Sequence, residues 1–231
     1  MATARIFVVT GGFGALGSTV AGAAVASGAR VALIDYAKDS GAGLAASANV
    51  MRLGGVDLAE EAPARDAMAK IAERFGQIDA LLNIAGGFKW ETLQDGSLET
   101  WRSLHKMNVM SAASACRAAI PHLKKSAAGR IVNVGAAAAL KAAAGMGPYT
   151  ASKSGVHNLT QALAEELKAD RITVNAVLPS IIDTPANRKD MPKADFAAWV
   201  QPTELANVIA FLCSDEASAI TGALVPVNGR V

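Results

Sequence analysis

The sequence predicts an α/β protein in which a doubly wound parallel sheet of about seven strands carries helices on both faces. Short β-branched runs alternate with longer, Ala-rich stretches of helical character. A glycine-rich turn joins the first apolar run to the first helical stretch. Hydrophobic residues make up 52% of the 231 residues and aromatic residues only 5%, which suits helices with small side chains packed on a sheet.

Seven short apolar runs have the length and residue types of buried strands. A parallel sheet covered on both faces buries both sides of each strand, so its strands are nearly continuous apolar runs. The expected strands are Arg5–Thr10, Arg30–Asp35, Val50–Leu53, Ala80–Ile84, Arg130–Gly135, Ile172–Leu178 and Ala223–Val227.

The stretches between these runs have the length and composition of crossover helices, which parallel neighbours require. The expected helices are Ala15–Ser27, Glu60–Phe75, Leu98–Lys124, Tyr149–Lys168 and Pro202–Ser214. No linker or tandem repeat divides the chain, so residues 1–231 are expected to form a single domain.

One segment, Ser180–Val200, interrupts this alternation. It contains prolines, the charged cluster Asn187–Asp190 and Trp199, and it fits neither a regular strand nor a regular helix. We expect an irregular insertion that acts as a lid over a substrate. The side chain of Trp199 is a candidate wall for a flat substrate ring, and ordinary packing is the alternative.

Composition and charge exclude several classes of function. The net charge of +2 comes from 22 basic and 20 acidic residues without a basic block, which argues against nucleic acid as a partner. No apolar run approaches the ~18 residues of a membrane span, and Ile6–Val9 leads into glycines rather than a cleavage site, so a cytoplasmic protein is expected. Cys116 and Cys213 are isolated, which predicts neither a metal site nor a disulfide.

The segment Gly12–Gly17 has the pattern GxGxxG between the first strand and the first helix. In this context the glycines allow a tight turn and a close approach to a pyrophosphate, whose charge the helix N-terminus stabilises. Asp35, at the end of the second strand, is placed to accept hydrogen bonds from the adenosine ribose and would repel a 2′-phosphate. NAD(H) is therefore favoured over NADP(H); a tight turn followed by a surface aspartate is the alternative.

Tyr149 and Lys153 lie four residues apart at the start of an expected helix, so they share one face. An ammonium near a phenol favours the phenolate and lowers the tyrosine pKa, which would let Tyr149 exchange a proton with a substrate. Such pairs are also common on ordinary helix surfaces. The upstream glycine turn favours the functional interpretation.

Over essentially its whole length the sequence resembles the short-chain dehydrogenase/reductase family, whose fold is a Rossmann-like domain. The resemblance rests on Thr10–Gly17, Asp57-Leu58, Asn83–Gly86, Asn108, Tyr149–Lys153 and Pro179–Thr184. It implies that Tyr149 is the acid–base group, that Lys153 lowers its pKa and holds the nicotinamide ribose, and that Asn108 supports a relay water. The expected cofactor-binding residues are Gly11, Gly12, Phe13, Gly14, Ala15, Leu16, Gly17, Asp35, Tyr36, Asp57, Leu58, Ala85, Gly86, Gly87, Tyr149, Lys153, Pro179, Ile182 and Thr184.

The sequence departs from the family pattern at three positions. Ala15 and Ser180 replace glycines, and Ala136 stands where the family carries its catalytic serine. The missing hydroxyl predicts weak polarisation of a substrate carbonyl, so a substrate that is already strongly electrophilic is favoured. The dihydropteridine reductase branch also lacks this serine, and Gly11–Ser18, Ala85–Gly87 and Asp183–Phe196 resemble it closely.

The resemblance implies an NAD(H)-dependent oxidoreductase acting on a small electrophilic substrate, such as a quinonoid dihydropterin. A carbonyl or alcohol dehydrogenase, for example one similar to 3-oxoacyl reductases, is the first alternative. A catalytically weak NAD-binding sensor or scaffold is the second. The family also implies a homo-oligomer formed through the helices Leu98–Lys124 and Tyr149–Lys168.

Overall fold

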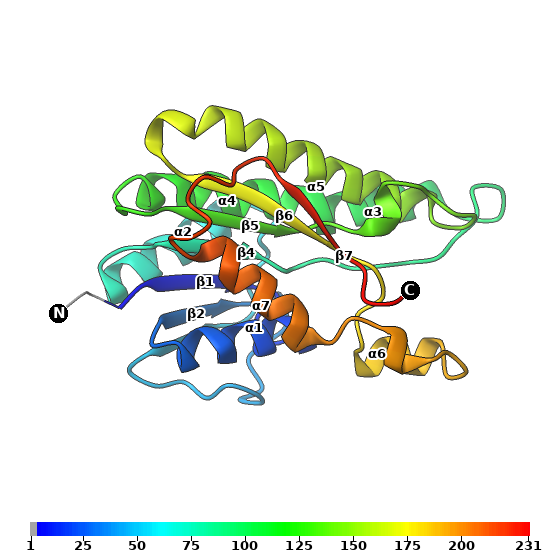
Figure 1. Ribbon diagram of the computed structural model, residues 1–231, viewed down its shortest axis with the longest axis horizontal. Coiled ribbons are helices and arrows are strands. Elements are labelled where there is room, and N and C mark those ends of the chain that lie inside the picture. Colours follow the sequence, from blue (N-terminus) through cyan, green and yellow to red (C-terminus); the bar gives the residue numbers. More distant parts are fainter. Residues whose placement is uncertain (1–3) are drawn as a thin grey trace.

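Seven parallel strands form one sheet in the order β3-β2-β1-β4-β5-β6-β7 (Figure 1). The computed structural model describes residues 4–231. Every expected strand is confirmed, with its ends shifted by one residue at most. The strands are β1 (Ile6–Thr10), β2 (Arg30–Ile34), β3 (Val50–Leu53), β4 (Ala80–Asn83), β5 (Arg130–Val134), β6 (Thr173–Pro179) and β7 (Leu224–Val227).

Helices cover both faces of this sheet, as expected (Figure 1). One layer holds α2, α4 and α5, and the other holds α1 and α7. The α-helices are α1 (Ala15–Ala26), α2 (Glu61–Phe75), α3 (Leu98–His105), α4 (Ser111–Leu123), α5 (Gly147–Glu166), α6 (Pro185–Asp190) and α7 (Pro202–Cys213).

The long helix expected over Leu98–Lys124 contains a π-helical turn, Lys106–Met110, between α3 and α4. A π turn inserts extra backbone into a helix and often marks a functional site. Here it carries Asn108, whose side chain is buried. The helix was predicted correctly, but its interruption was not.

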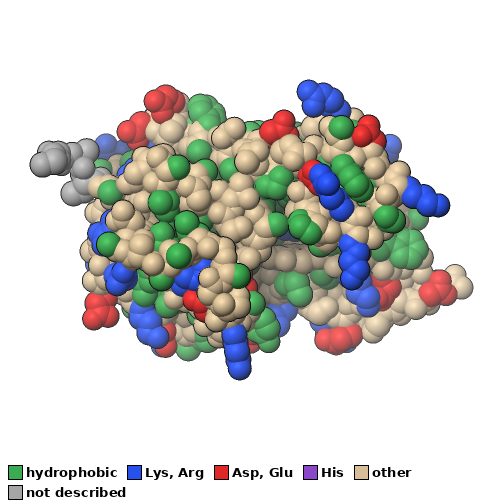
Figure 2. All heavy atoms as spheres, turned by 90° about the horizontal axis from the view of Figure 1, so that it is seen from below, with side chains coloured by type: hydrophobic (Ala, Val, Ile, Leu, Met, Phe, Trp, Pro, Cys, Tyr) green, Lys and Arg blue, Asp and Glu red, His purple; other side chains and the backbone are tan. Residues whose placement is uncertain are grey.

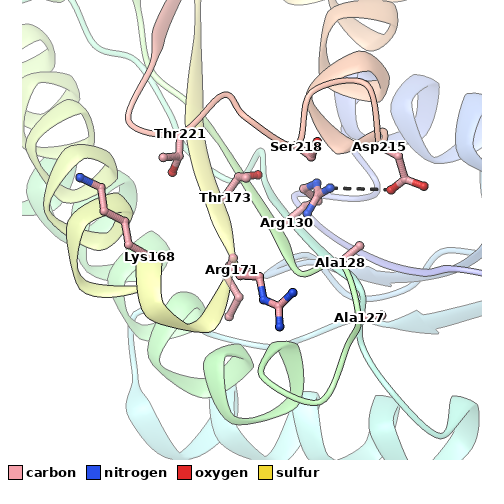
Figure 3. A pocket seen from close by; sticks show the side chains of 10 residues that line it. Ala127, Ala128, Arg130, Lys168, Arg171, Thr173, Asp215, Ser218 and Thr221 are labelled. Carbon is pink, nitrogen blue, oxygen red and sulfur yellow. Dashed lines mark ion pairs between the residues drawn. The ribbon is translucent and has the colours of Figure 1, made fainter.

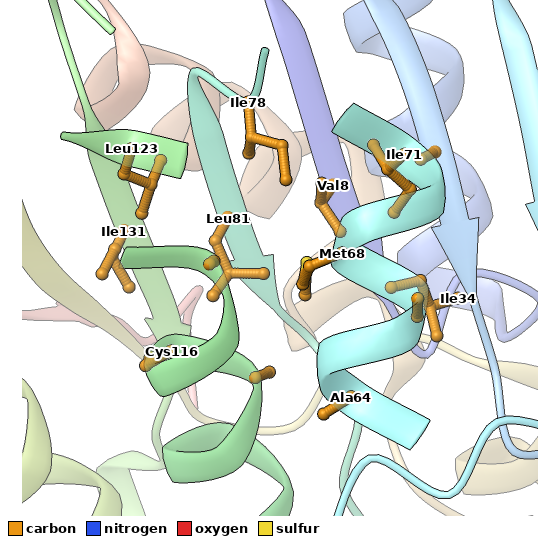
Figure 4. Packing of buried hydrophobic residues seen from close by; sticks show 14 of the residues in the cluster. Val8, Ile34, Ala64, Met68, Ile71, Ile78, Leu81, Cys116, Leu123 and Ile131 are labelled. Carbon is orange, nitrogen blue, oxygen red and sulfur yellow. The ribbon is translucent and has the colours of Figure 1, made fainter. Parts of the chain in front are cut away.

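The core forms because successive strand residues point to opposite faces of the sheet. In β1, Val8 packs in the layer of α2, whereas Val9 packs in the layer of α1. Figure 4 shows Met68 and Ile71 of α2 beside Val8. The buried positions of α2 recur every three or four residues, so one stripe of the helix faces the sheet.

The order of the strands reverses between β1 and β4, because the chain runs outward from β1 to β3 and then returns to the other side of β1. In an open α/β sheet, ligands bind at the carboxyl ends of the strands at such a switch point. The ends of β1 and β4 are therefore the first place to look for a site.

The surface carries charges of both signs. Figure 2 shows basic and acidic side chains interspersed over one face of the molecule. Between residues 4 and 231, no helix has both the length and the apolar character needed to cross a bilayer.

Candidate active site

Three glycines, two in the turn after β1 and one in the first turn of α1, leave no room for a side chain. Gly11 has a φ of 64°, and a Cβ on it would lie 2.9 Å from the backbone of Ala85. A Cβ on Gly12 would lie 2.8 Å from the side chain of Leu33, and one on Gly17 would lie 2.1 Å from the Gly11 carbonyl oxygen. The turn is thus packed against the end of β4 and against its own helix.

The N-terminus of α1 is open to an anion. Its N-cap, Gly14, has no side chain to accept from the first amides, and the first turn has no acidic residue. Ala15 begins the helix and is exposed, which explains why a side chain is tolerated where the family usually has glycine. Uncapped amides beside a tight glycine turn fit the pyrophosphate of a dinucleotide.

Thr10 joins the ends of β1 and β4. Its Oγ1 accepts hydrogen bonds from the amides of Ile84 and Ala85, both at 3.1 Å. These bonds hold the turn Ala85–Gly87 beside the glycine turn. The two segments that the sequence predicts to bind the cofactor therefore form one surface.

Asp35 follows β2 and holds the glycine turn from the other side. Its Oδ2 accepts from the amide of Phe13 at 3.0 Å, and its Oδ1 accepts from the amide of Ala37 at 2.9 Å. Each carboxylate oxygen has a further lone pair, so the group can still accept from a ribose hydroxyl. The neighbouring Tyr36 side chain is largely exposed.

Asp57 and Leu58 are less available to contact a cofactor than the sequence suggests. Asp57 accepts from the amide of Ala59 at 3.0 Å and lies 3.4 Å from the ammonium of Lys106. Leu58 is buried in the core beside α2.

Asn108 and Lys153 converge on the turn after β4. Asn108 Oδ1 accepts from the amide of Gly87 at 2.8 Å, and Nδ2 donates to the Gly87 carbonyl at 3.1 Å and to Ser152 Oγ at 2.9 Å. A Cβ on Gly86 would lie 2.6 Å from Asn108 Oδ1 and 3.3 Å from Lys153 Nζ. Lys153 therefore lies on the same side of the fold as the glycine turn.

The Tyr149 ring meets the edge of Phe88, with the ring centroids 4.9 Å apart and an interplanar angle of 83°. Phe88 was not singled out from the sequence. Its position directly after Gly86-Gly87 could have indicated it, because this turn leads into the site. Ser152 was also overlooked as a contact of Asn108, although it belongs to the tyrosine–lysine motif.

The pKa of Tyr149 differs from the sequence-based expectation. An ammonium was expected to lower this pKa, but burial raises the pKa of Tyr149 to about 12. Burial also lowers the pKa of Lys153 to about 8. The Lys153 ammonium donates to the carbonyl of Val134 at 2.7 Å, so it is engaged by the end of β5. The expected lowering of the Tyr149 pKa is therefore wrong, because burial is the cause that sets its shift.

Ala136 follows β5 and is only 3% exposed. Its amide donates to Nε2 of His157 at 3.3 Å. Burial and the nearby Lys153 lower the pKa of His157, so this imidazole is a neutral acceptor at neutral pH. No hydroxyl stands at the position of the family's serine, and His157 supports the backbone there.

The irregular segment Ser180–Val200 begins after Pro179, which ends β6. Ile182 forms a bridge with Val200, and the amide of Asp183 donates to the Val200 carbonyl at 2.8 Å. Thr184 Oγ1 accepts from the amide of Asn187 at 3.3 Å and caps α6. The segment thus contains one short helix, which the sequence analysis did not predict.

Trp199 is 4% exposed, and its ring lies 4.8 Å from that of Phe196. This placement favours packing over contact with a substrate. The same segment is held by Arg188, whose guanidinium forms a bidentate ion pair with Asp183 at 2.5 and 2.7 Å.

Comparisons with known proteins agree with this geometry. A family model described as short chain dehydrogenase matches residues 5–195. Meso-2,3-butanediol dehydrogenase of Serratia marcescens is 34% identical over 235 residues, which cover 97% of this chain and 93% of that protein. A 3-oxoacyl-[acyl-carrier-protein] reductase of Synechocystis is 33% identical over 239 residues, with 98% and 96% covered.

Solved structures of short-chain dehydrogenases and reductases also resemble this fold. The 3-ketoacyl-(acyl-carrier-protein) reductase of Brucella melitensis, solved with NADH, superposes with a TM-score of 0.86 at 29% identity and covers 98% of both chains. A short-chain dehydrogenase/reductase of the same organism superposes with a TM-score of 0.89 at 31% identity, with 97% of this chain and 95% of that chain covered.

The glycine turn predicts a contrast between two substitutions. Gly17→Ala forces a Cβ against the Gly11 carbonyl and should lower the free energy of unfolding by about 1–3 kcal/mol. A Cβ on Gly14 would have its nearest contact at 3.4 Å, so Gly14→Ala should change the free energy of unfolding by less than about 0.5 kcal/mol. Urea unfolding measures both. Equal effects of the two changes would contradict the steric argument.

Lys153→Met should stabilise the protein at pH 7 by about 2 kcal/mol, because it removes a buried ammonium at the loss of one hydrogen bond. The lowered pKa means that the unfolded chain binds this proton more tightly than the folded protein does. The stability of the wild type should therefore approach that of the variant as the pH rises from about 8 to 10.5. Unfolding at several pH values checks this, with the exposed Lys141→Met as the control. A destabilised Lys153→Met at pH 7 would refute it.

Proposed function

Because the chain belongs to the short-chain dehydrogenase/reductase family, we propose that it is an NAD(H)-dependent enzyme in which Tyr149 transfers the proton. Family membership makes it a nicotinamide-dependent oxidoreductase. The choice of NAD(H), the residue roles and the substrate belong to the proposal. Its main support is the convergence of Lys153 and Asn108 on Gly86, next to the glycine turn.

The nicotinamide, when bound, supplies or accepts the hydride. Tyr149 donates its phenolic proton to the reduced substrate, or takes a proton back in the oxidative direction. A pKa of about 12 keeps the phenol protonated at neutral pH, which suits reduction. The Lys153 ammonium orients the nicotinamide ribose and favours the phenolate as the proton leaves.

Asn108 has a supporting role in this scheme. Both hydrogens of its amide are engaged, by Gly87 and Ser152. A relay water would therefore donate to a carbonyl oxygen of Asn108, either that of its main chain in the π turn or Oδ1, which has one lone pair left.

The Asp35 carboxylate and the ion pair between Arg52 and Asp39 favour NAD(H) over NADP(H) at the adenosine end of the site. The Asp35 carboxylate would repel a 2′-phosphate, and its orientation is set by the amides of Phe13 and Ala37. Arg52 lies over the Phe13 ring at 4.4 Å, but Asp39 holds its guanidinium in an ion pair at 2.6 Å. That cation is neutralised and offers little to a phosphate.

The substrate that we propose first is a small electrophile that needs little polarisation, such as a quinonoid dihydropterin. It rests on Ala136, which leaves no side-chain donor at the serine position, and on the resemblance of the Asp183–Phe196 segment to dihydropteridine reductases. Loss of one such donor typically slows carbonyl chemistry by about 10²–10³-fold.

A carbonyl or alcohol substrate is the second candidate. The names of the relatives favour it, because one acts on butanediol and others on acyl-carrier ketones. A cofactor-binding sensor with little catalysis is the third. It would bind NADH tightly and show no turnover with any substrate.

We also propose that the chain forms a homo-oligomer. Leu98, Met107 and Met110 expose apolar side chains along α3 and the π turn, in the helical segment that the family commonly uses between subunits. Light scattering that shows a monomer at every concentration would remove this proposal.

Tyr149→Phe tests the reaction. With NADH and quinonoid dihydropterin, kcat should fall by about 10²–10⁴-fold, because the proton donor is lost, while NADH affinity stays within about threefold. NADPH and a panel of ketones and alcohols serve as parallel assays, and exposed Gln161→Ala on the same helix is the control. Equal turnover by Tyr149→Phe and wild type would disprove the role of the tyrosine.

Ala136→Ser tests the meaning of the missing hydroxyl. It should raise kcat/KM for ketones by about 10–10²-fold and leave the activity with a quinonoid dihydropterin nearly unchanged. Ala138→Ser, two residues further along, is the matched control. If the ketone activity does not rise, the absent serine is not what limits carbonyl reduction.

A further inference from the structure

A hollow of about 490 Å³ lies at the amino ends of β5 and β6 (Figure 3). The glycine turn lies at the opposite end of the sheet, where the parallel strands have their carboxyl ends. Three loops surround it: the one before β5, the one before β6 and the one before β7. Its size is within the range of small-molecule sites. None of the residues assigned to the nicotinamide site lines it.

The lining is rich in positive charge. Arg130, Lys168 and Arg171 contribute cationic groups, and Asp215 is the one acidic residue that lines the hollow. Lys168 is already paired with Glu165 at 2.6 Å. Arg171 makes no ion pair within residues 4–231, and its side chain is exposed.

Arg130 is a buried cation without a close counter-ion. Its side chain is 4% exposed, and its Nε has no hydrogen-bond partner among the described residues. The carboxylate of Asp215 lies 3.7 Å from Nη2 and is itself 87% exposed (Figure 3). A buried charge needs a well-placed partner, and an exposed carboxylate at this distance is a weak one.

A second arginine strengthens the positive field. Arg5 donates to the carbonyl of Ala128, which lines the hollow, at 3.0 Å. Burial and the charge of Arg5 both lower the pKa of Arg130. The two guanidiniums therefore repel each other, and an anion beside them would relieve that repulsion.

Thr173 also lines the hollow, with a hydroxyl that is free to bond to a ligand. The residue is 5% exposed, and its Oγ1 has no partner among the described residues, although buried hydroxyls are normally hydrogen-bonded. In Figure 3, Thr173 is drawn beside Arg130 and above Arg171. A hydroxyl and two guanidiniums thus face one hollow from neighbouring strand ends.

Arg171 is held in an unusual backbone conformation. Its φ of 55° is the one positive value among the non-glycine residues of 4–231. The turn that contains it is anchored by Asp170, which pairs with Lys124 at 2.9 Å. This conformation ends the helical turn Lys168–Asp170, with the Arg171 amide donating to the Lys168 carbonyl, and it fixes where the Arg171 side chain leaves the backbone.

We propose that this hollow binds the phosphoryl group of a small phosphate ester or of free phosphate. Guanidiniums match the oxygens of a phosphoryl dianion in a bidentate manner, and a tetrahedral group can meet donors from several directions. Nη1 of Arg130 donates to the Gly129 carbonyl at 3.0 Å, and Nη2 donates to the Ser214 carbonyl at 3.4 Å. Nε and one hydrogen on each terminal nitrogen therefore remain for the anion, and Asp215 competes for Nη2. The proposal does not depend on the reaction at the other end of the sheet.

Calorimetric titration of the full-length protein with sodium phosphate and, separately, with glycerol 3-phosphate tests this site. Excess NADH is present so that the glycine turn is occupied, and binding of NADH is measured first as an independent check of the proposed function. We expect one saturable site per chain. Tighter binding of the ester identifies an ester as the ligand, and equal affinity identifies free phosphate.

Four variants locate the binding. Arg171→Ala should weaken phosphate binding at least tenfold. Thr173→Val should weaken it about threefold or more, without lowering the melting temperature. Asp215→Asn should tighten it about threefold, because a competing negative charge is removed. Arg102→Ala, an exposed arginine on α3, should have no effect. Absence of saturation up to about 10 mM in the wild type, or unchanged binding in both Arg171→Ala and Thr173→Val, overturns the proposal.

Discussion

The close contact between the ends of β1 and β4 positions the rest of the candidate active site. Backbone meets backbone at Gly11 and Ala85, where no side chain fits, and the Thr10 hydroxyl joins the two ends. Gly86 and Gly87 then present their backbone to Asn108 and Lys153. A displacement of the glycine turn would therefore be transmitted to the lysine through a continuous series of contacts.

Burial of polar groups is the second constraint. Lys153 is buried and Tyr149 is partly buried, and burial shifts the pKa values of both side chains towards their neutral forms. This arrangement is unfavourable for folding, because desolvation penalises the charged form of each group. The protein tolerates it because the carbonyl of Val134 accepts from the ammonium.

Much of the fold could be predicted from the sequence, because buried parallel strands such as Val31–Ile34 are apolar on both faces and end at glycine or polar residues. The glycine turn and its link to Asp35 could also be predicted from spacing. The π turn could not, because one extra residue within a helix hardly alters the hydrophobic period. The raised pKa of Tyr149 depends on burial in three dimensions, and so does the packing of Trp199. The short helix α6 was overlooked, although Thr184-Pro185 is a typical helix start.

The irregular segment after β6 is closed on itself. Its entry at Ile181–Asp183 and its exit at Val200 are hydrogen-bonded to each other, so the chain leaves the framework and returns at nearly the same point. Insertions or replacements between these ends need not disturb the register of β6 or the start of α7. The length and sequence of this segment can therefore vary among related proteins while the sheet stays unchanged.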